Sequence, residues 1–158
     1  MHPNEQLIHQ FYQSFQKLDA EAMADCYHKD IEFSDPAFPD LKGKMAGNMW
    51  RMLCSQATNF ELSYSDVMAD GMSGSAYWQA SYDFSKTGRR VHNKIQASFL
   101  FEDGKIIQHV DSFNFWRWSK MALGPAGLLL GWSPLLRNKV SGMANKSLKQ
   151  YCEKHQLV

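Results

Sequence analysis

A histidine and an aspartate separated by one residue, His109 and Asp111, form the pair in this sequence best suited to moving protons. On a β-strand, such side chains leave the same face, about 7 Å apart along the backbone. Burial and a neighbouring charge tune both groups towards neutrality, where general acid/base catalysis is efficient. Asp35, which precedes Pro36, is the third catalytic candidate. The alternatives are a solvated contact on an outer face for the pair and a turn-forming role for Asp35.

Other side chains are suited to forming the walls of a pocket around these groups. Asn93 lies on an otherwise apolar strand face, and a buried amide needs a hydrogen-bond partner, for which a ligand is one option. Aromatic residues suit a hydrophobic small molecule, although ordinary core packing is their commoner role. The predicted ligand-binding residues are Tyr12, Trp50, Trp78, Tyr82, Asn93 and Phe113.

The cysteines and histidines form no recognisable metal-binding motif. Cys26, Cys54 and Cys152 are widely spaced and odd in number, without a CxxC pair. We expect them to be reduced thiols without a catalytic role. His28 is expected at the surface, in the turn after the second helix. The chain is predicted to use neither a metal nor an organic cofactor.

The composition argues against several classes of function. The 158 residues are 44% hydrophobic, which supports a packed interior rather than disorder. Seventeen basic residues balance sixteen acidic ones, and no nucleic-acid-binding surface is expected, because phosphate binding needs clustered Lys and Arg. The N-terminus shows no secretion signal, and the longest apolar stretch, 124–136, falls short of the ~20 residues that span a bilayer. We expect a cytoplasmic protein without a transmembrane segment.

Apolar residues at spacings of three and four predict three helices in the first part of the chain. The first runs from about 4 to 18, and Asp19 is the predicted N-cap of a short second helix. The third runs from about 44 to 56. Between the second and third helices, residues 31–36 predict a short strand that ends at Pro36.

From Phe60 onward the hydrophobic period changes from helical to alternating. Four segments are separated by turn signals at 70–71, 87–88 and 103–104, each of which contains a glycine. This pattern predicts an antiparallel meander, strongly curved if it wraps a core. The predicted fold class is therefore α+β, with a curved antiparallel sheet wrapped on the N-terminal helices.

The C-terminal tail differs from the rest of the chain. We predict an α+β domain at residues 1–121 and a C-terminal helical extension at residues 122–158. The extension contains a leucine-rich patch at 128–136 and a helix from about 138 to 155. We expect the extension to pack over the domain or against a second subunit. A membrane-surface role is the weaker alternative, because the basic residues of the last helix are few and mixed.

The order of these elements resembles the SnoaL-like domains and ketosteroid isomerases of the nuclear transport factor 2 superfamily. The helix–helix–strand opening that ends at Asp35-Pro36 is similar to theirs, and residues 104–111, Gly-Lys-Ile-Ile-Gln-His-Val-Asp, resemble their last strand. The resemblance covers about Leu7 to Trp118 and implies their cone-shaped fold. It is poor as a guide to function, since this fold hosts enzymes, carriers and dimerisation modules.

The resemblance assigns roles to only some residues. Asp35 matches the general base of the isomerases, and Asp111 looks like the acid/base aspartate of the SnoaL-like cyclases. An ungapped comparison places the isomerase oxyanion-hole donors on Phe11 and near Ala97, neither of which donates a side-chain hydrogen bond. Limonene epoxide hydrolases add an Arg-x-Asp pair on the neighbouring strand, where this chain has Lys-Ile-Gln at 94–96. Both of these chemistries therefore lack key groups here.

The combined interpretation is a cofactor-independent acid/base enzyme, an isomerase, cyclase or hydrolase, acting on a hydrophobic small molecule. A non-catalytic carrier or sensor that uses the same pocket is one alternative. The other is an interaction module, in which the sheet face and the 128–136 patch form a homodimer. A homodimer is compatible with all three interpretations.

Overall fold

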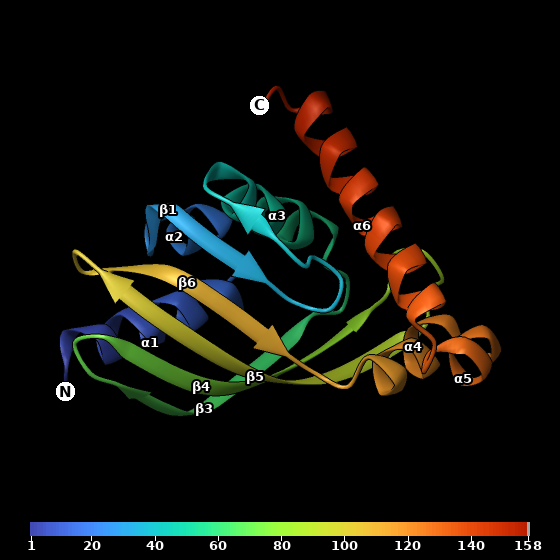
Figure 1. Cartoon of the computed structure of the whole chain (residues 1–158), viewed down its shortest axis with the longest axis horizontal. Coiled ribbons are helices and arrows are strands. Elements are labelled where there is room, and N and C mark those ends of the chain that lie inside the picture. Colours follow the sequence, from blue (N-terminus) through green and yellow to red (C-terminus); the bar gives the residue numbers. More distant parts are fainter. Residues whose placement is uncertain (158) are drawn as a thin grey trace.

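The computed structural model describes residues 1–157 and consists of helices packed against one strongly curved sheet (Figure 1). The N-terminal helices are α1 (Pro3–Gln16), α2 (Ala20–Asp25) and α3 (Lys44–Gln56). The strands are β1 (Tyr27–Ser34), β2 (Leu41–Lys42), β3 (Glu61–Ala69), β4 (Ser73–Asp83), β5 (Arg90–Glu102) and β6 (Lys105–Ser112). The C-terminal helices are α4 (Phe115–Leu123), α5 (Pro125–Leu130) and α6 (Pro134–Lys154). The predicted α+β class is confirmed.

The N-terminal helices form where apolar residues recur at helical spacing. The apolar stripe of α1 buries Ile8, Phe11, Tyr12 and Phe15. Asp19 caps α2 as predicted, because its carboxylate accepts a hydrogen bond from the Ala22 N–H at 3.1 Å. The limits of α3 agree with the predicted range of 44–56.

The sheet has the strand order β2-β1-β6-β5-β4-β3. Strands β3 to β6 form the predicted antiparallel meander, and Val91, Asn93 and Ile95 share the buried face of β5. Strand β1, however, pairs with β6 in parallel. The predicted antiparallel sheet is confirmed for β3 to β6, and the parallel β1–β6 pair is a feature that was not predicted from the sequence. Alternation along a strand reports which of its faces is buried, but it carries no information about the direction of a neighbouring strand.

Strand β1 begins at Tyr27, earlier than the predicted start at Ile31. His28 is consequently a strand residue whose side chain is only 11% exposed, which corrects its predicted position in a surface turn. Its Nε2 lies 3.4 Å from a carboxylate oxygen of Glu102 and 3.7 Å from one of Asp103. The longer strand also carries the Tyr27 ring into the interior.

The C-terminal helices gather at one end of the sheet, and α6 runs from there past α3 (Figure 1). Leu148 and Cys152 of α6 are buried in the main core. The Leu157 main-chain carbonyl accepts a hydrogen bond from the Asn48 side chain of α3 at 3.3 Å. The tail thus packs on the rest of this chain, while the domain boundary at residue 121, which α4 crosses, remains a prediction. No helix within residues 1–157 is long and apolar enough to cross a membrane.

Helix α5 packs against α4 through two glycines. A Cβ at Gly127 would lie 1.8 Å from the Ser119 carbonyl oxygen, and one at Gly131 would lie 2.1 Å from the Ser119 Oγ. Such distances are far inside van der Waals contact, so a side chain at either position would force the helices apart. Because both glycines face α4, the leucines at 128–130 lie on the outer side, and each is at least 50% exposed.

We expect Gly127→Ala to lower the free energy of unfolding by about 1–3 kcal/mol, because its methyl group meets main-chain atoms of Ser119. Gly142→Ala in α6 is the matched control, since a Cβ there meets nothing within 4 Å. That control should raise the free energy of unfolding by up to about 1 kcal/mol through helix propensity. Urea unfolding measures both changes, and equal stability of the two variants would contradict the close α4–α5 packing.

Candidate functional site

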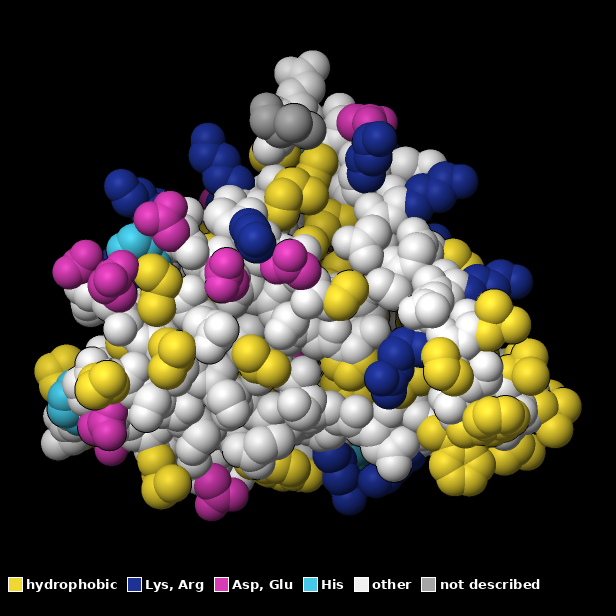
Figure 2. Space-filling model, viewed as in Figure 1, with side chains coloured by type: hydrophobic (Ala, Val, Ile, Leu, Met, Phe, Trp, Pro, Cys, Tyr) yellow, Lys and Arg dark blue, Asp and Glu magenta, His cyan; other side chains and the backbone are white. Residues whose placement is uncertain are grey.

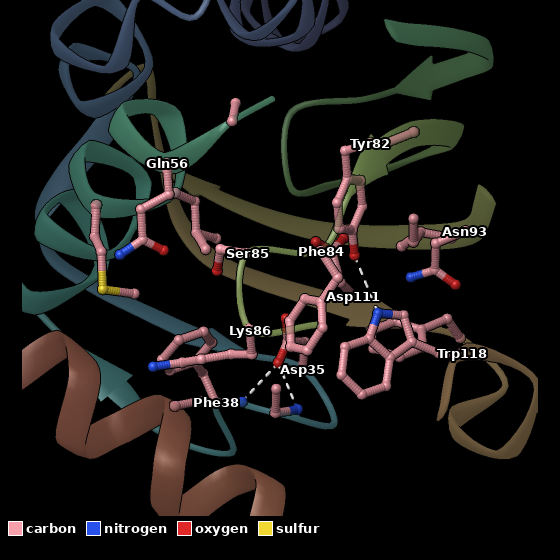
Figure 3. Close-up of a pocket in the computed structure, with 18 of the residues that line it drawn as sticks. Asp35, Phe38, Gln56, Tyr82, Phe84, Ser85, Lys86, Asn93, Asp111 and Trp118 are labelled. Carbon is pink, nitrogen blue, oxygen red and sulfur yellow. Dashed lines mark hydrogen bonds between the residues drawn. The ribbon is translucent and has the colours of Figure 1, made fainter. Parts of the chain in front are cut away.

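A cavity of about 230 Å³ lies between the sheet and helices α3, α4 and α6 (Figure 3). Its walls are mainly apolar, and their aromatic residues include Phe15, Trp50, Trp78, Tyr82, Phe113 and Trp118. Three of the polar residues that reach it are Asp35, Asn93 and Asp111. An apolar chamber with a few convergent polar groups is the general form of a small-molecule site.

Asp111 of β6 lines the cavity and belongs to a series of linked side-chain hydrogen bonds. Its Oδ1 lies 2.9 Å from His109 Nε2 and accepts a hydrogen bond from the Trp78 indole N–H at 3.3 Å. The other imidazole nitrogen, Nδ1, lies 2.7 Å from the Tyr27 hydroxyl. That hydroxyl accepts a hydrogen bond from the Trp50 indole N–H at 2.9 Å. Side chains from α3, β1, β6 and β4 thus form one continuous buried chain, called the tyrosine–histidine chain below.

The donors and acceptors of the tyrosine–histidine chain determine where its protons lie. Burial raises the pKa of the Tyr27 hydroxyl well above its usual range, so this group keeps its proton. Because Tyr27 accepts the Trp50 N–H, its own proton points to His109 Nδ1. His109 Nε2 then carries the imidazole proton and donates a hydrogen bond to Asp111 Oδ1. The geometry therefore fits a His109 imidazole that accepts at Nδ1 and donates at Nε2, and this donation orients the Asp111 carboxylate.

His109 itself does not line the cavity. Its side chain is completely buried, and the rings of Phe11, Phe33 and Phe99 pack around it at centroid distances of 5.4, 5.0 and 4.6 Å. Asp111 is also buried but reaches the cavity. The structure brings the predicted His-x-Asp pair together on the inner side of the sheet, and only the aspartate has direct access to a ligand.

Asp35 lies in the loop between β1 and β2 and lines the same cavity as Asp111 (Figure 3). Its Oδ1 accepts hydrogen bonds from the main-chain N–H groups of Ala37 (2.8 Å) and Phe38 (2.6 Å). The turn-forming role and the position in the pocket therefore coexist. Burial raises the pKa of Asp35 to about 7, with a further contribution from the charge of Asp111, although the two main-chain hydrogen bonds oppose the shift. Near neutral pH the Asp35 carboxyl is a mixture of protonated and ionised forms.

The predicted ligand-binding residues that line the cavity are Trp50, Trp78, Tyr82, Asn93 and Phe113. Tyr12 lies outside its walls, fully buried among the rings of Tyr64, Trp78 and Phe99. The Tyr12 hydroxyl has no hydrogen-bond partner within residues 1–157. Ligand binding by this set of side chains remains a prediction.

Two parts of the site were missed by reasoning from the sequence. Tyr27 falls in a segment predicted as a turn, and the exposed Lys29 interrupts the alternation that would have indicated a longer strand. The second part is the set of C-terminal helices, from which Trp118 of α4 and several residues of α6 close the cavity. The Trp118 indole N–H donates to the Tyr82 hydroxyl at 3.0 Å (Figure 3). No local sequence pattern relates these helices to a pocket on the sheet.

A cluster of possible metal ligands lies apart from the cavity. His28, Glu102 and Asp103 bring ligand atoms within 4.8 Å of one another. The two carboxylates are 57% and 84% exposed, and none of the three residues lines the cavity. Sequence spacing does not reveal this cluster because its members come from β1 and the end of β5. Exposed acidic groups commonly gather without a metal, and the chemistry of the cavity does not involve this cluster.

Comparison with protein families gives one match over most of the chain's α+β core. Residues 8–109 match the family model described as a SnoaL-like domain, which is more than half of the chain. Among curated proteins, none is significantly similar in sequence.

Solved structures of similar proteins share the fold at low sequence identity. TerC, co-crystallized with polyporic acid, is 18% identical with a TM-score of 0.65, covering 77% of this chain and 99% of TerC. An LEH-like epoxide hydrolase from M. tuberculosis is 18% identical with a TM-score of 0.65, covering 83% and 97%. A putative polyketide cyclase from Xanthomonas campestris pv. campestris is 18% identical with a TM-score of 0.61, covering 73% and 93%. Similarity at this level establishes the fold alone.

Two buried tyrosines should respond oppositely to loss of their hydroxyl groups. Tyr27→Phe leaves the Trp50 N–H and His109 Nδ1 without their partner, so we expect the free energy of unfolding to fall by about 2 kcal/mol. Tyr12→Phe removes a buried hydroxyl without a partner, and we expect a rise of up to about 1 kcal/mol. Chemical denaturation measures both. A destabilised Tyr12→Phe variant would show that this hydroxyl has a partner after all.

The raised pKa of Asp35 makes stability depend on pH in a defined direction. The pKa is about 7 in the folded protein and ordinarily 3.8, so the folded state holds this proton more tightly than the unfolded chain. The stability that Asp35 contributes is present below about pH 4 and is lost as the pH rises through about 7. In thermal unfolding, Asp35→Asn should remove this decline, whereas Asp30→Asn, which changes an exposed carboxylate of β1, should keep it. Parallel pH curves for wild type and Asp35→Asn would contradict the assignment.

Proposed function

The chain belongs to the family of SnoaL-like domains, and from that membership we propose that its cavity binds a small, flat, largely apolar carbonyl compound and transfers a proton at the carbon beside the carbonyl. The observation that carries this proposal is the pair of carboxyl groups, Asp35 and Asp111, which reach one apolar cavity from unlike environments. When the surroundings of two titratable groups favour different protonation states, one group can act as the acid and the other as the base.

Asp111 is the proposed base. Both hydrogen-bond partners of its Oδ1 are N–H groups, of Trp78 and of His109, so this oxygen acts only as an acceptor. Oδ2 is then the oxygen available to take the proton from the substrate carbon. His109 serves as a positioning residue, because it is buried behind Asp111 and holds the carboxylate plane. As the C–H bond breaks, its electron pair moves into the carbonyl group and produces an enolate oxygen.

Asp35 is the proposed acid. With a pKa of about 7, a large fraction of Asp35 is protonated at neutral pH and can give its proton to the developing enolate oxygen. Protonated Asp111 then gives its proton to a carbon of the enol, and ionised Asp35 takes back the enol O–H proton, so both groups recover their starting forms with no cofactor consumed. Return to a different carbon isomerises the substrate, whereas attack of the enol carbon on a second carbonyl closes a ring. Both outcomes share the first step, which is the activity proposed here.

The walls of the cavity support a small aromatic or polycyclic substrate. Trp50, Trp78 and Phe113 provide flat apolar faces. Asn93 is 8% exposed and lines the cavity, so its amide can reach a substrate oxygen. The cavity volume of about 230 Å³ lies below the ~300–1,000 Å³ usual for drug-sized ligands. The expected ligand is correspondingly small.

Exchange of carbon-bound hydrogen for deuterium tests the shared first step without knowledge of the final product. A panel of small aromatic and bicyclic ketones is incubated with the protein in D₂O, and deuterium uptake is measured by mass spectrometry. We expect catalysed exchange for at least one ketone, and Asp111→Asn should reduce its rate by about 10²-fold or more. The wild-type rate should decline above about pH 7, where Asp35 ionises, and this decline should be absent in Asp35→Asn.

Binding measured in parallel separates a catalyst from a carrier. Trp50, Trp78 and Trp118 line the cavity, so quenching of tryptophan fluorescence reports ligand binding. In a catalyst, both asparagine variants still bind the ketone but exchange it more slowly than wild type. Asp30→Asn should leave binding and exchange unchanged. A carrier would bind ketones with nearly equal affinity in all variants and catalyse no exchange in any of them, and that result would refute the enzymatic proposal.

A further inference from the structure

The end of the molecule formed by α4, α5 and the start of α6 carries a concentrated apolar surface. Figure 2 shows hydrophobic side chains gathered at the end where Figure 1 places these helices. We call this surface the apolar tip, which consists of Trp116, Leu128, Leu129, Leu130, Trp132 and Leu135. Each of these side chains is between 41% and 77% exposed. Contiguous exposed apolar surface of this kind marks an interaction site.

The apolar tip is held in place by the packing beneath it. The close approach of Gly127 and Gly131 to α4 turns the leucines between them outward. The Trp116 indole N–H donates to the Leu128 carbonyl at 3.1 Å, and the Trp132 indole N–H donates to the Leu129 carbonyl at 2.8 Å. These hydrogen bonds hold both indoles on the outer side of the helices and give each indole N–H an acceptor. Tryptophan placed in this way is typical of side chains that sit at the boundary between lipid and water.

The charge around the apolar tip has a single sign. Residues 112–140, which include α4, α5 and the start of α6, contain four Lys and Arg residues and no Asp or Glu, although the whole chain has seventeen basic and sixteen acidic residues. Two of these cations lie beside the aromatic rings of α4: Lys120 Nζ is 4.2 Å from the centre of the Trp116 ring, and the Arg137 guanidinium is 5.3 Å from that of Phe115. The overall balance of charge therefore conceals a cationic segment around an apolar surface.

This combination favours a lipid surface over a second copy of the chain. Most homodimers are isologous, so a dimer through the apolar tip would bring two identical cationic segments together. Lys and Arg near the tip would then repel their counterparts, with no acidic residue at 112–140 to compensate. Anionic lipid headgroups supply the opposite charge, and the acyl chains below them accept leucine and tryptophan.

We propose that the apolar tip docks onto the surface of an anionic phospholipid bilayer, with its leucine and tryptophan side chains inserted below the headgroups. The attachment lies in the plane of the surface, because no helix within residues 1–157 is long and apolar enough to cross the bilayer. Trp118 of α4 and Val140 of α6 line the cavity, so the helices that carry the tip also form part of the cavity wall. Docking would hold the cavity wall close to apolar compounds dissolved in the bilayer. The docking proposal does not depend on catalysis in the cavity.

Sedimentation with vesicles tests the docking directly. The whole chain is mixed with vesicles of phosphatidylcholine alone or of phosphatidylcholine with an equal part of phosphatidylglycerol. We expect binding to the anionic vesicles to be at least about tenfold stronger and to weaken as salt is added. Tryptophan emission should shift to shorter wavelength, because Trp132 (73% exposed) and Trp116 (41% exposed) would leave water, whereas the other three tryptophans are already buried.

Paired variants separate the apolar and the electrostatic contributions. Leu129→Ser with Trp132→Ser should reduce binding to anionic vesicles by about tenfold or more. Arg137→Gln with Lys139→Gln should reduce that binding by a similar factor and lessen its dependence on salt. The matched control is Met68→Ser with Met72→Ser, which removes side chains that are 65% and 78% exposed at the β3–β4 turn. This control should bind as wild type does.

Two results would overturn the proposal. The first is that anionic vesicles bind the chain no more strongly than neutral vesicles do, or that the variant with Leu129→Ser and Trp132→Ser binds anionic vesicles as strongly as wild type. The second is the absence of vesicle binding together with a dimer, measured by light scattering, that Leu129→Ser with Trp132→Ser dissociates. That second result would assign the apolar tip to a second copy of the chain. Thermal unfolding of each variant verifies that it is folded, since all substituted side chains are exposed.

Discussion

The hydrogen-bonded chain from Trp50 through Tyr27, His109 and Asp111 to Trp78 is the constraint on which the interior of this protein depends. Each link satisfies a polar group that would be costly to leave unpaired among aromatic rings. Its members come from α3, β1, β6 and β4, so it closes only when the helix, the parallel strand pair and the curved meander are all in place. The orientation of the Asp111 carboxylate is therefore a property of the whole fold.

The second carboxyl group of the cavity is held in a different way. Asp35 is fixed by main-chain N–H groups of its own turn, and local geometry therefore determines where it points. Its protonation, by contrast, is set by the apolar walls and by the charge of Asp111, which lies far away in the sequence. The division of labour proposed for the two residues follows from this difference. In the proposal, the desolvated Asp35, with a pKa of about 7, acts as the acid, and Asp111, whose Oδ1 faces two side-chain N–H groups, acts as the base.

The C-terminal helices connect the interior to the outer surface. On the inner side, Trp118 donates to the Tyr82 hydroxyl and closes the end of the cavity. On the outer side, the same helices carry the apolar tip among basic residues. The glycines at 127 and 131 make this arrangement possible, because only the absence of a side chain lets α5 approach α4 so closely. Helices α4 and α6 thus form part of the cavity wall in this chain.

The sequence by itself determined helices α1 to α3, the antiparallel meander and the buried face of β5, because periodicity is a local consequence of backbone geometry. It also identified Asp35 and Asp111 as the acidic groups that reach a pocket, although whether they act as catalysts is a proposal. Only the tertiary structure decided the parallel pairing of β1 with β6, the partnership of Tyr27 with His109 across 82 residues, and the closure of the cavity by the tail. These features depend on contacts between elements that are far apart in the chain, and local spacing carries no record of which distant surfaces will meet.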